Sequence, residues 1–68
     1  MSDHAEDARA LLSAATSLDY AGQDCATANR DLRIGNTQVA LSTLRDAITE
    51  LESARDEITQ VLEWLENA

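Results

Sequence analysis

The chain has 68 residues, enough for one small domain, and its single cysteine excludes an intramolecular disulfide. Thirteen acidic residues against five arginines give a net charge of −8, which disfavours direct binding of nucleic acid or an anionic membrane surface and favours a basic protein partner. No run of 18 apolar residues is present, and the acidic N-terminus lacks the apolar segment of a secretory signal, so we expect a cytoplasmic protein.

A first helix is predicted over residues 3–34, with Ser2 as its N-cap, because apolar and small residues recur every seven positions. One line of this repeat consists of Leu11, Leu18, Cys25 and Leu32, and a second of Ala14, Ala21 and Ala28. Gly22 lies inside the segment and raises an alternative, a break near this residue that would give three helices. We favour the continuous helix because the repeat crosses Gly22 without a change of phase.

A turn is predicted at residues 35–36. Gly35 suits the left-handed position just past a helix end, and Asn36 suits the N-cap of the next helix. Arg30 and Arg33 precede the turn, where cations interact favourably with the helix dipole.

A second helix is predicted over residues 37–66. It carries a leucine-rich seam with alternating three- and four-residue spacing, formed by Leu41, Leu44, Ile48, Leu51, Ile58, Leu62 and Leu65. A neighbouring line contains Ala40, Ala47, Ala54 and Val61, and Trp64 extends it. Such a period is typical of left-handed coiled-coil packing, and the short turn makes the two helices antiparallel neighbours.

The fold class is therefore all-α, a single helical hairpin with the leucine seam packed between its helices. The lines of alanine, valine and tryptophan would then remain outside and leave an apolar patch. We accordingly expect a homodimer that forms a four-helix bundle, since a chain this short gains little stability from its own core.

Arg55 occupies the position where the seam asks for a leucine. In a hairpin that turns near residue 35, position 55 faces residues 15–19, so Asp19 is the expected partner and Glu52 a second one. A single polar group in a coiled-coil seam typically specifies register or oligomer state at some cost in stability, and this is the role we assign to Arg55. The alternative is that its long side chain simply reaches water at the edge of the seam.

One segment resembles a known repeat. The pattern A-x6-G-N-x3-A-L-x2-L-x2-A-I, from Ala28 to Ile48, is similar to the turn region of a tetratricopeptide repeat. The aromatic positions of that repeat are not matched, Glu52 stands in place of its final proline, and no second copy follows. The resemblance implies shared helix packing and no peptide-binding groove.

Catalytic chemistry is not indicated. His4 and Cys25 lie 21 residues apart, about 31 Å along a continuous helix, so they cannot form a dyad within one chain. The carboxylates follow no di-metal pattern, and no phosphate loop or nucleophile motif is present, so we expect no enzyme activity, no metal and no cofactor. Cys25 is interpreted as a small buried seam residue.

Charge is distributed unevenly along the predicted hairpin. Residues 23–47 hold three acidic residues and three arginines, whereas residues 1–12 and 57–68 hold six acidic residues and one arginine, a net charge of −5. The helix dipole disfavours Glu63 and Glu66 at a C-terminus, so a role outside the fold is expected for them. The predicted partner-binding residues at this end are Asp3, Glu6, Asp7, Glu63, Trp64 and Glu66.

Three functional classes follow from these observations. The favoured one is a non-catalytic protein-interaction module, an adaptor or regulator that binds a basic surface. The alternatives are an inhibitor that mimics nucleic acid and occupies a basic groove, as some small phage proteins do, and a structural assembly element.

Overall fold

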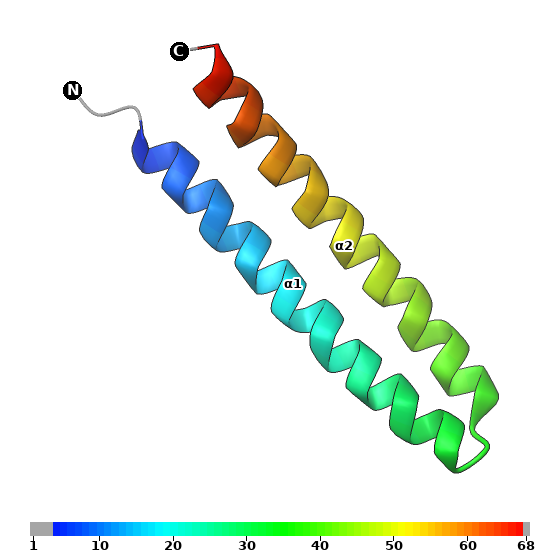
Figure 1. The fold of residues 1–68 in the computed structure, drawn as a ribbon. Coiled ribbons are helices and arrows are strands. Elements are labelled where there is room, and N and C mark those ends of the chain that lie inside the picture. The colour runs from blue at the N-terminus through cyan, green and yellow to red at the C-terminus, as the bar shows by residue number, and fades with distance from the viewer. Residues whose placement is uncertain (1–3, 68) are drawn as a thin grey trace.

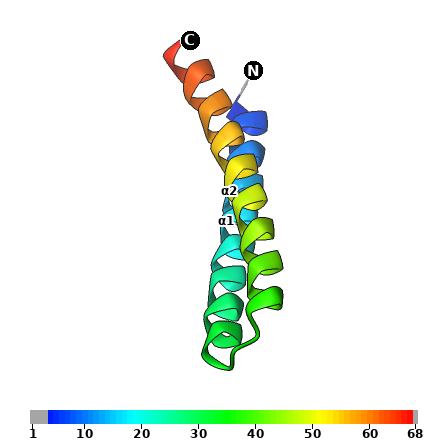
Figure 2. The same cartoon turned by 90° about the vertical axis from the view of Figure 1, so that its right-hand side faces the viewer.

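The protein is an antiparallel helical hairpin in the computed structural model, which describes residues 4–67 (Figure 1). Helix α1 spans His4–Arg33 and helix α2 spans Thr37–Glu66, and the two form a rod of 54 × 15 × 12 Å. In side view the helices stay in contact along the rod and cross at a shallow angle (Figure 2). The all-α hairpin expected from the seven-residue repeats is therefore confirmed. The predicted N-cap Ser2 and the predicted first helical residue, Asp3, lie outside the described residues.

The turn closes through a Schellman motif at the C-terminus of α1. The backbone N–H of Gly35 donates to the carbonyl of Leu32 over 3.1 Å, and that of Asn36 donates to the carbonyl of Asp31 over 2.7 Å. Gly35 has a φ of 81°, the left-handed conformation that favours glycine at this position. Asn36 is the N-cap of α2, but its side chain makes no capping hydrogen bond, so only the position of this residue was correctly predicted.

Helix α1 continues through Gly22 without a break, so the three-helix alternative is wrong. A glycine inside a helix costs about 1 kcal/mol relative to alanine. No tight contact within the hairpin requires it, because a Cβ added at Gly22 would meet nothing within 4 Å. The hairpin alone offers no reason for this glycine.

Alanines form the contact between the two helices. The buried residues are Ala14, Ala21 and Ala28 of α1 and Ala40, Ala47, Ala54 and Val61 of α2. Each alanine is at most 3 % exposed, whereas Leu44 and Leu51 of the leucine-rich seam remain 40 % and 41 % exposed. The prediction that this seam packs inside the hairpin is wrong, because the alanine lines are inside and the leucines outside.

The matching of the two helices explains this outcome. Both carry an alanine every seven residues, so small side chains oppose small side chains at successive levels of the rod. Small residues let two helix backbones approach closely, which brings more atoms of both helices into van der Waals contact. The leucines of α2 have no comparable line on α1, where only Leu11, Leu18 and Leu32 recur.

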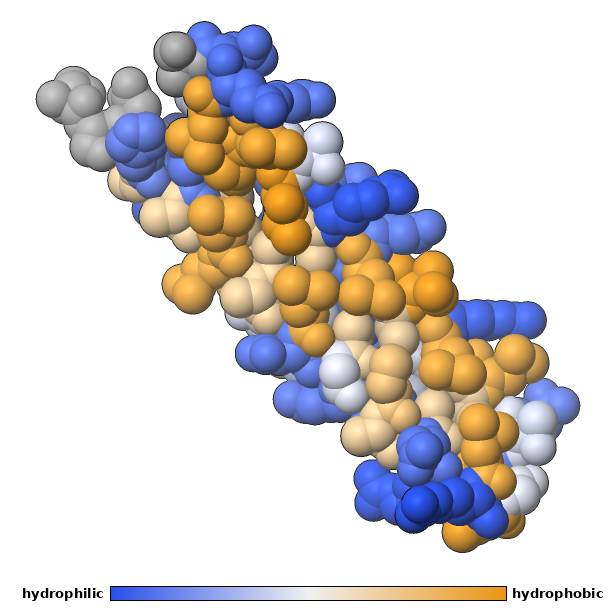
Figure 3. All heavy atoms as spheres, viewed as in Figure 1, coloured by the Kyte–Doolittle hydropathy of each residue, from blue (hydrophilic) through white to orange (hydrophobic). Residues whose placement is uncertain are grey.

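The alanine contact divides the hairpin into two unlike faces. The fourth residue after each buried alanine points to the same side of both helices, because the helices are antiparallel. We call this side the apolar face, formed by the exposed side chains of Leu11, Leu18, Leu32, Leu41, Leu44, Ile48, Leu51, Ile58, Leu62 and Leu65. Figure 3 shows these leucines and isoleucines gathered over both helices.

The third residue after each buried alanine points to the opposite side. Here lie the half-buried carboxylates that we call the acidic row, namely Asp24, Asp31, Glu50 and Glu57. This side is the acidic face, and Trp64 ends it near the free ends of the helices. One molecule therefore presents an apolar surface on one side and an anionic surface on the other.

Candidate acidic binding site

The part of the chain that the structure describes offers no metal-binding cluster, and its free cysteine is exposed. No group of three or more His, Cys, Asp or Glu among residues 4–67 could hold a metal ion. Cys25 is exposed and lies four residues after buried Ala21, so it is not buried inside the hairpin. Over the same residues, neither helix is long and apolar enough to cross a membrane.

The acidic row joins the two helices at mid-rod through a pair of carboxyl groups. A hydrogen bond with Asp24 raises the pKa of Glu50 above its ordinary value of 4.5, and partial burial together with the charges of Asp24 and Asp46 acts in the same direction. Two carboxylates held this close repel each other unless one of them is protonated. The pair is therefore a place where negative charge is concentrated at some cost to the fold.

Three oxygen atoms of the row are buried and lack a hydrogen-bond partner. They are Asp31 Oδ2, Glu50 Oε1 and Glu57 Oε1. A buried acceptor without a donor is unfavourable, which favours rotation of these side chains outward, where their oxygens can accept N–H groups from water or from another molecule.

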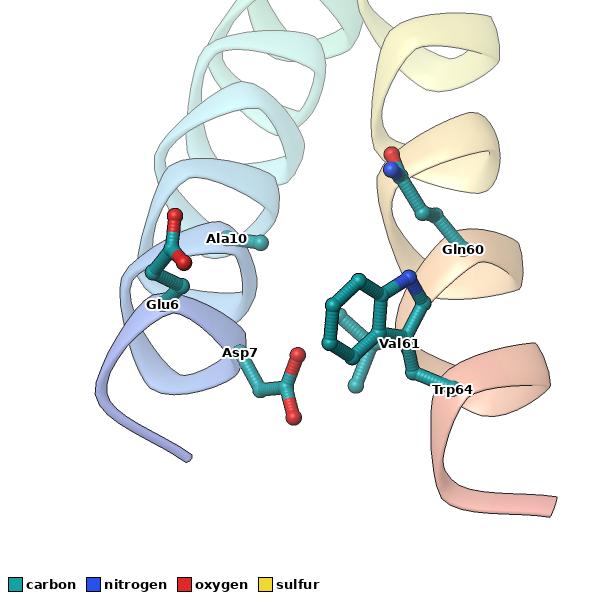
Figure 4. A pocket seen from close by; sticks show the side chains of 6 residues that line it. All are labelled: Glu6, Asp7, Ala10, Gln60, Val61 and Trp64. Carbon is teal, nitrogen blue, oxygen red and sulfur yellow. The ribbon is translucent and has the colours of Figure 1, made fainter. Parts of the chain in front are cut away.

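A hollow of about 210 Å³ lies at the end of the acidic face, between the first turns of α1 and the last turns of α2. It is lined by Glu6, Asp7, Ala10, Gln60, Val61 and Trp64. Asp7 and the indole of Trp64 project toward each other from the two helices (Figure 4). Trp64 is 56 % exposed, so most of its ring is open to a ligand.

Asp7 is the most enclosed charge in the hollow. Its side chain is 15 % exposed, and its Oδ2 lies 3.6 Å from Nδ1 of His4, one turn earlier in α1. The helix N-terminus also favours negative charge at Glu6 and Asp7. The hollow thus combines two carboxylates with an aromatic face.

The structure divides the predicted partner-binding residues into two groups. Glu6, Asp7 and Trp64 meet in the hollow, as their grouping at one end predicted. Glu63 and Glu66 are exposed and lie about 200° and 140° around α2 from buried Val61, so they point away from the hollow. Asp3 lies outside the described residues.

Arg55 does not occupy the space between the two helices. Its side chain is 71 % exposed, and its Nη2 lies 3.5 Å from Oδ1 of the adjacent Asp56. Asp19, the partner expected from the level of the rod, is also exposed. Arg55 instead lies one residue after buried Ala54, at the border of the apolar face.

Sequence reasoning missed Gln60 of the hollow and all four residues of the acidic row, namely Asp24, Asp31, Glu50 and Glu57. The signal was present, since Glu50, Glu57 and Trp64 recur at intervals of seven residues, directly beside the line of Ala47, Ala54 and Val61. The net charge of a segment does not show the direction in which a helix presents its carboxylates.

Comparisons with known proteins do not extend this description. No protein-family model, no curated protein and no solved structure matches the chain. The site therefore has to be interpreted from its own residues.

Proposed function

We propose that the chain is a non-catalytic cytoplasmic protein-interaction module that binds a basic partner protein through its acidic face. The observation that carries the proposal is the hollow, where Glu6 and Asp7 of α1 stand opposite the exposed indole of Trp64. Two carboxylates beside an aromatic ring suit an arginine or lysine side chain, which can pair with the acids while lying on the ring.

The acidic row supports the same kind of partner. An arginine-rich helix or loop lying along the rod would offer N–H donors to the carboxylates of Asp31, Glu50 and Glu57 once their side chains rotate outward and expose the unpartnered oxygens. It would also relieve the repulsion between Asp24 and Glu50.

The experiment is a titration of the protein with an oligoarginine peptide, followed by the fluorescence of Trp64. Trp64 is the only tryptophan, so a change in emission reports directly on the hollow. We expect saturable binding that weakens as salt rises. The double substitution Glu6→Gln and Asp7→Asn should weaken binding about tenfold, since each exposed ion pair contributes up to about 1 kcal/mol.

The matched control is Glu63→Gln with Glu66→Gln. This pair removes the same amount of charge from the same end of the rod, but from side chains that point away from the hollow. If both double variants weaken binding equally, net charge alone drives association and the hollow is not the site. An unchanged Trp64 emission in the unsubstituted protein would likewise contradict the proposal.

A further inference from the structure

The apolar face is large enough to be one half of a stable interface. With Cα extents of 54 × 15 Å, the broad side of the rod covers roughly 800 Å², about what each partner contributes to a standard protein interface. Ten large aliphatic side chains on it are 40 % exposed or more, and a continuous patch of that kind usually marks a binding surface. Arg55, at the border of the apolar face, carries the only charge among the residues one or four positions after a buried alanine or Val61.

We propose that a second copy of this chain covers the apolar face, with the two-fold axis along the rod, so that both turns lie at the same end. This arrangement sets α2 of each copy over α1 of the other and forms a four-helix bundle. The proposed dimer does not use the acidic face, which points outward on both sides of the bundle.

The two halves of the face are complementary in size. On α2, the line that projects farthest from the apolar face consists of Leu41, Ile48, Arg55 and Leu62. On α1, the corresponding line consists of Ala8, Ala15, Gly22 and Asn29. Residues at the same level of the rod have numbers that add up to about 70, as the turn between Arg33 and Thr37 requires. In the proposed dimer each larger side chain of one copy therefore stands opposite a smaller residue of the other.

Gly22 is explained by this pairing. It is exposed in a continuous helix, and nothing in its own chain approaches the place of its missing side chain. At its level of the rod lies Ile48 of the second copy, a large β-branched side chain. With the turns at opposite ends, α1 would lie over α1 and α2 over α2, so small residues would face small ones and leucines would crowd leucines.

The arrangement also assigns a partner to Arg55. Its guanidinium comes within one turn of Asp19 of the second copy, on the rim of the contact between α2 and the opposing α1. The two acidic ends lie side by side in this dimer, so their repulsion opposes association. Added salt should therefore strengthen the dimer, in contrast to its effect on the binding of a basic peptide.

Sedimentation analysis tests the dimer. At micromolar concentration we expect twice the 7.4 kDa mass of the chain, with a dissociation constant that decreases as salt is added. Ile48→Asp should raise that constant at least about tenfold, while Thr49→Asp, the same change on the outward side of α2, should leave it nearly unchanged. A helical monomer at these concentrations, or equal effects of both variants, would overturn the proposal.

Adding bulk to α1 avoids the risk that a charged variant unfolds. Gly22→Leu fills the space proposed for Ile48 of the second copy, whereas Gln23→Leu places the same side chain on the outward surface. Gly22→Leu favours the helix and Gln23→Leu leaves helix propensity nearly unchanged, so a merely structural glycine would make both variants at least as stable and as dimeric as the parent. We expect only Gly22→Leu to weaken the dimer, and a dimer that withstands it would refute the pairing.

The direction of the two copies is tested with a spin label at Gln38→Cys, beside the turn, in a Cys25→Ser background. Turns at the same end give a short distance between the two labels. Turns at opposite ends give a distance near the 54 Å length of the rod and would exclude the proposed axis.

Discussion

Replacing Ala47 by leucine enlarges a side chain at the contact between the two helices. Ala47 is 3 % exposed, and buried Ala21 occupies nearly the same level of α1. Overpacking a close contact of this kind costs about 1–3 kcal/mol, because the helices must separate or the leucine must leave its preferred rotamer. A core this small rarely supplies more than about 3–5 kcal/mol, so the loss is a large part of the total stability.

Thermal unfolding followed by circular dichroism at a fixed protein concentration measures this effect. For a chain of this size, a loss of about 2 kcal/mol lowers the midpoint by about 10 °C. The control is Ala26→Leu, the same change at an exposed position of α1, which should shift stability by less than about 0.5 kcal/mol. If Ala47→Leu unfolds at the same temperature as the control, or at a higher one, the alanine lines do not form the contact between the helices.

Substitutions at three further residues test the turn, the acidic row and the border of the apolar face. Gly35→Ala should destabilise the protein by about 1 kcal/mol in denaturant unfolding, because alanine resists the left-handed conformation, and Gly35→Asn should cost less. The folded chain binds the proton of Glu50 more tightly than the unfolded chain does. The bound proton therefore stabilises the fold below pH 4.5, and this contribution to folding stability is lost as pH rises through the raised pKa. Glu50→Gln should therefore melt higher than the parent at neutral pH, and the difference should shrink toward pH 4.5; a constant difference would exclude the repulsion from Asp24 as its cause. Arg55→Leu should raise the melting temperature or change the oligomer size by sedimentation, because its exposed pairing with Asp56 contributes little; a destabilised variant of unchanged stoichiometry would show that its ion pairs are indispensable.

The elements and the turn could be predicted because their signals are local. Gly35 requires only its own backbone conformation, and the seven-residue repeats identify both helices without knowledge of their neighbours. The same repeats kept Gly22 inside α1, since a break would have changed their phase.

The line that packs inside the hairpin could not be chosen from apolarity alone. Leucine buries more area than alanine, and this favours the leucine-rich seam of α2 as the buried line. A helix in a hairpin, however, buries only one line of side chains, and that line must fit the facing line of the other helix. This fit depends on both helices together. Only the alanine lines place small buried residues at the same levels of the rod, namely Ala14 with Ala54, Ala21 with Ala47, and Ala28 with Ala40.

Only part of the candidate site could be predicted, because its residues also depend on which line of each helix is buried. Chain direction alone brings Glu6 and Asp7 to the level of Trp64, because a hairpin sets its first and last turns side by side. The direction of each side chain around its helix depends on which line is buried. An incorrect choice of that line left out Glu57 and grouped Glu63 with the hollow.

The antiparallel arrangement of α1 and α2, side by side from a common turn, has a mechanical consequence. The first turn of α1 and the last turn of α2 lie at the same end of the rod, so tension applied through them acts across the contact between the helices. Such a load opens the alanine levels one after another, starting beside Val61 and finishing beside Ala28 and Ala40, and never strains them all together. The hairpin should consequently open like a zipper at low force when it is held by its two ends, and resist far more when the same load shears one helix along the other.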